Sequence, residues 1–177
     1  MAPQLSGNFF TVNLEATRRA FEDVPWVRQA VAFWGEDGSS RMVNSFGELF
    51  EANAGEVDAD DLPRLAGPDD QAEEVLAMYR AVAPLFEPLD LVVEALQLSG
   101  RGSWQVVLDT GAKVELGRGD VAVVLPRVQR FAQTLTQVAS RYERRPEALV
   151  SADLRYGDGY AIRLRGVGTV TADAKKG

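Results

Sequence analysis

The chain has 177 residues, of which 46% are hydrophobic and 25% are charged, a composition typical of a soluble globular protein. Its formal net charge of −7 argues against binding of a phosphate backbone as the main activity, so we expect no nucleic-acid partner. Cysteine and histidine are both absent, which removes the commonest metal ligands and the commonest general base, so we expect neither a metal nor a cofactor.

Helix and strand patterns alternate along the chain, and the clearest is an amphipathic stripe that runs to Tyr142. In chain order the predicted elements are a helix that begins at Asn13 and ends at Pro25, a strand at 26–35, two short strands around a turn at Gly47 within 41–52, a loop at 53–68, a helix at 68–86, a strand at 89–100, a hairpin at 103–117, a helix at about 121–142 and a hairpin within 151–166. This order predicts an α+β fold, in which a mainly antiparallel sheet has its helices packed on one face.

The last hairpin raises the question of what covers the end of the sheet. Its sequence, SADLRYGDGYAIRLRG, indicates two strands around a tight Gly-Asp-Gly turn, with Tyr160, Ile162 and Leu164 on one face of the second strand. No strand pattern is predicted after it, because 167–177 has the composition of a flexible tail. We therefore expect this second strand to be an edge strand, whose unpaired N–H and C=O groups can recruit a strand from a partner.

One short motif offers an enzymatic alternative. The stretch VVLDTGA at 106–112 has the pattern with which aspartic proteases place a catalytic carboxylate, but that chemistry needs two carboxylates that share a proton. The sequence contains a single Asp-Thr-Gly, at 109–111, so a protease of this kind would have to be a dimer. A hairpin turn explains the same residues, with glycine supplying a positive φ. We favour the turn, and with it a binding or scaffold module over an enzyme.

Six ordered segments carry a more specific signal: GNFFTVNLEATRRAFEDVPWVRQA, RMVNSFGELFEAN, LPRLAGP, LSGRGSWQVVLDTGAKVELGRGD, VQRFAQTL and ADLRYGDGYAIRL. Together they resemble the periplasmic part of the FtsQ/DivIB family of bacterial division proteins, in its proteobacterial form. The resemblance runs from about residue 7 to residue 166. It implies a partial POTRA-like segment at 7–30, a β domain at 31–166 and a tail at 167–177.

The resemblance also implies a function, which is a non-enzymatic scaffold in cell division and septum formation. The location that it implies is the periplasmic face of the inner membrane, enriched at the division septum. It implies that FtsB, together with FtsL, binds by strand addition to the C-terminal edge strand of the β domain. The partner-binding residues that match the family's motifs are Arg101 in GRGSW, Arg155 and Tyr156 in DLRY, and Tyr160, Ile162 and Leu164 in the edge strand.

The chain departs from the family's pattern in two places. Family members begin with a cytoplasmic tail and one membrane helix, whereas no apolar run here approaches the roughly 18 residues of a membrane span. We therefore expect this chain to be the soluble part, associated with the membrane only through a helix that it lacks. It also passes directly from VPWVRQ to AVAFWG, where the family has the remaining POTRA strands. We expect a POTRA-like segment that keeps its helix and little of its sheet.

Overall fold

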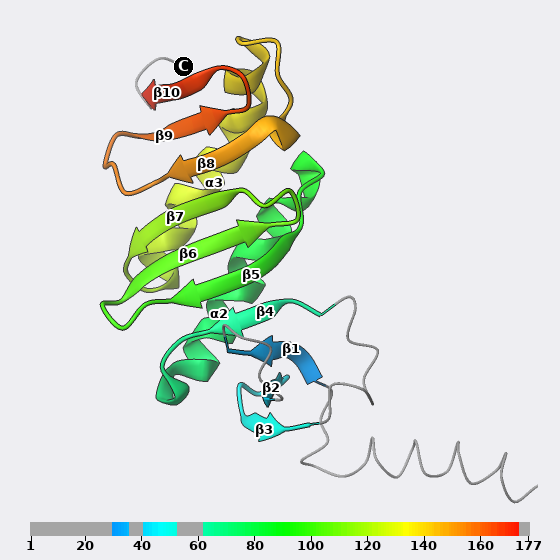
Figure 1. The fold of residues 1–177 in the computed structure, drawn as a ribbon. Coiled ribbons are helices and arrows are strands. Elements are labelled where there is room, and N and C mark those ends of the chain that lie inside the picture. Colours follow the sequence, from blue (N-terminus) through cyan, green and yellow to red (C-terminus); the bar gives the residue numbers. More distant parts are fainter. Residues whose placement is uncertain (1–29, 36–40, 53–61, 174–177) are drawn as a thin grey trace, which may run out of the picture.

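The computed structural model describes residues 30–35, 41–52 and 62–173, and within them ten strands form one sheet (Figure 1). The strands are β1 (Ala30–Trp34), β2 (Arg41–Asn44), β3 (Leu49–Glu51), β4 (Arg64–Ala66), β5 (Val93–Leu98), β6 (Ser103–Leu108), β7 (Lys113–Arg118), β8 (Leu149–Asp153), β9 (Gly159–Leu164) and β10 (Gly168–Asp173). The helices are α2 (Ala72–Val82) and α3 (Val121–Ser140), with short 3₁₀ turns at Asp69–Gln71, Ala83–Leu85, Glu87–Leu89 and Pro146–Ala148. The helix predicted to begin at Asn13 lies outside the described residues, so the POTRA-like segment stays a prediction.

The order of strands in the sheet is β10-β9-β8-β7-β6-β5-β4-β1-β2-β3. Most neighbours are antiparallel, and the three parallel pairs are β1 with β4, β4 with β5 and β7 with β8. Parallel neighbours cannot be joined by a tight turn, and two of these pairs are joined through a helix, α2 between β4 and β5 and α3 between β7 and β8. Both helices lie on the same face of the sheet (Figure 1). The predicted α+β class, with helices on one face, is confirmed.

The core lies between the two helices and the sheet. The predicted hairpin at 103–117 is confirmed, and in β6 every second side chain, Trp104, Val106 and Leu108, is buried. The ring of Phe131 in α3 meets Tyr160 of β9 edge-on, with 5.1 Å between ring centroids. These contacts fix α3 against the C-terminal part of the sheet, where the candidate site lies.

Two strands occur where none was predicted. β4 lies within the predicted loop at 53–68, and its three residues are too few to show a periodic pattern between Pro63 and Gly67. β10 lies within the predicted tail, so the expectation of a flexible tail is wrong for residues 168–173. The chain reverses after β9 through Gly166 and Gly168, which both have positive φ, and returns antiparallel to β9.

Neither α2 nor α3 combines the length and the apolar character that crossing a membrane requires, a statement limited to the residues that the structure describes.

Candidate partner-binding surface

Residues from two loops meet at one end of the sheet, which we call the basic end. Because β7 and β8 are parallel, their carboxyl ends lie together, and β6, antiparallel to β7, begins beside them. The turn that carries Arg101 and the loop that carries Arg155 and Tyr156 therefore extend from the same end (Figure 1). Two strand spacings, about 10 Å, separate β6 from β8. The structure thus brings together three of the residues assigned to partner binding by motif.

Arg101 occupies the exposed tip of the β5–β6 turn. The turn is closed by hydrogen bonds from the N–H of Ser103 to the Ser99 hydroxyl, at 3.0 Å, and from the N–H of Gly102 to the Ser99 carbonyl, at 2.9 Å. Gly102 has φ of +77°, a conformation that favours glycine. A closed turn of this kind presents the guanidinium of Arg101 to solvent without burying it.

Arg155 is held in place by the carboxylate of Asp153. Its guanidinium donates to both carboxylate oxygens, at 2.8 and 2.6 Å, and its backbone N–H donates to the same group at 3.0 Å. The hydrogen bond from the Arg155 side chain lowers the pKa of Asp153 below its ordinary value. The neighbouring Tyr156 is 58% exposed, an unusual environment for a large aromatic side chain. The pair is therefore an ordered cation beside an open aromatic ring, both residue types that recur at binding hot spots.

The expectation that the strand with Tyr160, Ile162 and Leu164 is the edge of the sheet is wrong. β9 pairs with β8 on one side and with β10 on the other, so its backbone groups are engaged in two ladders. All three side chains are buried in the core, with exposed fractions of 3%, 1% and 1%. The sequence signal that could have identified the true edge is the run Thr-Val-Thr-Ala at 169–172, which is rich in β-branched residues and follows a Gly-Val-Gly turn.

β10 is the last strand at this side of the sheet among the described residues. In an antiparallel ladder alternate residues direct their N–H and C=O groups toward one neighbour, so half of those in β10 point away from β9. Val170 and Ala172 pack against the core, whereas Thr169 and Thr171 are exposed. The six residues thus offer a strand-length row of backbone donors and acceptors.

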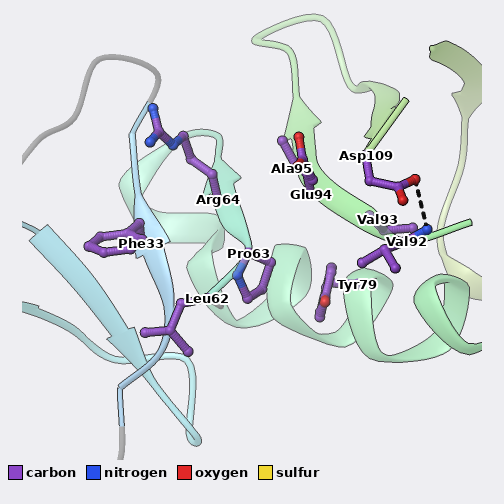
Figure 2. A pocket seen from close by; sticks show the side chains of 10 residues that line it. All are labelled: Phe33, Leu62, Pro63, Arg64, Tyr79, Val92, Val93, Glu94, Ala95 and Asp109. Atoms are coloured by element: carbon purple, nitrogen blue, oxygen red, sulfur yellow. Dashed lines mark hydrogen bonds between the residues drawn. The ribbon is translucent and has the colours of Figure 1, made fainter. Parts of the chain in front are cut away.

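The Asp-Thr-Gly at 109–111 forms a tight turn at the opposite end of the sheet, as predicted. Gly111 has φ of +82°, and its N–H donates to the carbonyl of Leu108 at 2.8 Å. The Asp109 carboxylate accepts from the N–H of Val92 at 3.1 Å, beside a hollow of about 700 Å³ (Figure 2). Since the carbonyl of Val92 also accepts from the N–H of Asp109, the carboxylate anchors the start of β5 to the turn. A structural role accounts for this aspartate.

Comparison with known proteins identifies the family of this chain. The family described as "Cell division protein FtsQ/DivIB, C-terminal" matches residues 32–155. A protein named "Cell division protein FtsQ" from Burkholderia pseudomallei is 41% identical over 194 aligned residues, which cover 98% of this chain and 74% of that protein. Proteins of the same name from Bordetella pertussis and Thiomonas arsenitoxydans are 39% and 37% identical, and in each case 93% of this chain is covered, with 70% and 67% of the relative. The family match spans more than half of the chain, and the relatives exceed 30% identity over nearly all of it, so the chain belongs to the FtsQ/DivIB family of cell division proteins.

Proposed function

We propose that this chain is a non-enzymatic scaffold of the division machinery that binds FtsB, and with it FtsL, by adding a strand of FtsB to β10. We propose that it is located at the periplasmic face of the inner membrane, at the septum. The observation that carries the proposal is that β10, an outer strand of the sheet within the described residues, lacks the protection that edge strands usually have. Edge strands are usually protected by short length, charged residues or proline. β10 has six residues, of which only Asp173, at its end, is charged, and it contains no proline.

The other outer strand of the sheet provides a contrast. β3 has only three residues and ends in Glu51. A short strand with a charge offers little template for pairing, so this edge has the usual protection. Of the two outer strands in the described residues, β10 is therefore the better site for strand addition.

The basic end supports the same proposal. β10 runs antiparallel to β9 and so finishes at the end of the sheet where β9 begins, next to the loop with Arg155 and Tyr156. A partner strand beside β10 would extend to these side chains. We propose that Tyr156 supplies an aromatic anchor, and that Arg155 and Arg101 supply charge-assisted hydrogen bonds to acidic groups of the partner.

Calorimetry and hydrogen exchange test the proposal together, with the FtsB ectodomain of the same bacterium as the titrant. We expect alternate amides of residues 168–173 to gain protection when FtsB binds, because their outward N–H groups become donors in a new ladder. We expect Tyr156→Ala to weaken binding by about 1–3 kcal/mol while the melting temperature stays near that of the wild type. Binding without new protection in β10 would place the site elsewhere, and no binding at all would reject the proposal.

A further inference from the structure

A groove runs beside β10 on the helix-covered side of the sheet. It has a volume of about 180 Å³ and lies between the C-terminal half of α3 and the strands β9 and β10. It is lined by Arg130 and Thr134 of α3, by Arg141 just after the helix, and by Val170 and Ala172 of β10. The distance along the helix from Arg130 to Arg141 is about 16 Å, comparable with the length of β10. The groove therefore follows β10, the outer strand at this side of the described sheet, over most of its length.

The groove combines an apolar floor with a basic rim. Tyr160 is buried at its base, and its hydroxyl lies 2.6 Å from the hydroxyl of Thr134. Arg141 is exposed just beyond the end of α3, and Arg130 donates to the carbonyl of Gly157 at 3.3 Å. Helix α3 contains arginines and no acidic residue. Next to Arg141 in the sequence, Tyr142 is 38% exposed, although the amphipathic pattern predicted it on the buried stripe.

A strand added to β10 would face this groove with every second side chain. Side chains of neighbouring strands align across a ladder, and successive residues point to opposite faces. Val170 and Ala172 are the β10 residues that pack against the core on the helix side. The partner residues beside them would also lie on the helix side, over the groove, whereas the others would stand beside the exposed Thr169 and Thr171.

We propose that this groove selects the helix-facing side chains of the strand that adds to β10. It fits an apolar side chain against Val170 and the Tyr160 ring, with a carboxylate beside it that pairs with Arg141. The inference rests on the proposed strand addition and extends it, because it assigns sequence selection to α3 as well as to the loops of the basic end. Backbone pairing supplies affinity for any extended segment, and pockets beside the edge supply specificity.

Charge reversal at Arg141 tests the groove. In Arg141→Glu a carboxylate would face the partner's carboxylate and repel it. We therefore expect the affinity of this variant for the FtsB ectodomain to fall by about tenfold or more. Lys113→Glu is the matched control, since Lys113 is exposed on β7, three strands from β10, and undergoes the same change of charge. We expect the control to bind like the wild type, apart from a small effect of net charge.

A second experiment tests whether Arg141 pairs with one particular carboxylate of FtsB. Acidic residues of the FtsB segment that protects β10 are replaced one at a time with lysine, and one replacement should restore the affinity of Arg141→Glu. Equal affinities of Arg141→Glu and Lys113→Glu, with β10 still protected, would overturn the groove proposal and leave strand addition standing. Absence of β10 protection in the wild type would overturn both.

Discussion

Gly47 shows how one residue can fix the approach of two elements. It has φ of +83° in the β2–β3 turn, and a Cβ at this position would lie 2.5 Å from the Cα of Glu73, in the first turn of α2. Only glycine lets the turn approach this backbone so closely. The sequence predicted a turn at Gly47, but a contact 26 residues away along the chain has no local pattern.

We expect Gly47→Ala to lower the free energy of unfolding by more than about 2 kcal/mol, because the strain of a positive φ adds to a clash with backbone. Gly102→Ala is the control, since Gly102 has φ of +77° and a Cβ added there would meet no atom within 4 Å. It should cost about 1–2 kcal/mol from backbone strain alone. Urea unfolding measures both. Equal losses in the two variants would show that the contact with α2 is loose.

The ion pair between Asp153 and Arg155 predicts a pH dependence. Arg155 lowers the folded-state pKa of Asp153, so the pair stabilises the fold above the unfolded-state pKa of about 3.9. That contribution disappears as the pH falls through the lower, folded-state value. Asp153→Asn should therefore be less stable than the wild type at pH 7, by a small amount because Arg155 is largely exposed.

The difference between the two proteins should shrink as the pH falls from about 4, where Asp153 becomes protonated in the unfolded wild type, through the lower folded-state pKa, below which it is neutral in both states. Urea unfolding at several pH values between about 7 and 2 follows this change. A difference that stays constant down to about pH 2 would mean that the substitution acts through packing or hydrogen bonding and not through the charge of Asp153.

At the scale of elements, the sequence predicted those with a strong local period. The β6–β7 hairpin was predicted around its Asp-Thr-Gly turn, and α3 from its apolar stripe. β4 could not be predicted in this way, because three residues make no period and its partners β1 and β5 are distant in the sequence. β10 is hidden for another reason: Gly166 and Gly168 beside Val167 give the segment the composition of a tail, whereas in the structure they form the turn into the strand. At the site, the sequence placed Arg101 in a connection, where the structure has it, but it extended the strand before the last turn through Arg155 and Tyr156, which lie in the loop after β8. It also assigned the edge to the wrong strand.

Removal of β10 tests whether residues 168–173 contribute to stability as a strand of the sheet. A chain that ends at residue 166 loses the contacts of Val170 and Ala172 with the core and exposes the ladder side of β9. We expect this chain to be less stable than the full chain by about 1–2 kcal/mol, as measured by urea unfolding. A chain that ends at Asp173 is the control and should match the full chain. Equal stability of the shorter and longer chains would show that β10 contributes nothing in solution.

At the scale of the whole molecule, charge is divided along the sequence. Residues 1–100 contain 6 Lys and Arg against 18 Asp and Glu, whereas residues 101–177 contain 13 against 8. The net charge of −7 therefore conceals a basic C-terminal part, which includes α3, β10 and the loop with Tyr156. An acidic partner segment would be attracted toward the surface on which we propose that it binds, and repelled by the rest of the chain.

This division of charge predicts how FtsB binding depends on salt. Electrostatic steering acts mainly on the encounter, so the association rate should fall by about tenfold between about 0.05 and 0.5 M NaCl, while the dissociation rate changes less. Stopped-flow mixing with the FtsB ectodomain measures both rates. Arg141→Glu should show a weaker dependence on salt than Lys113→Glu, because it removes a positive charge at the groove and not at a distance from β10. An association rate that does not change with salt would mean that backbone pairing and apolar contacts alone guide the encounter, and that the basic C-terminal part has another purpose.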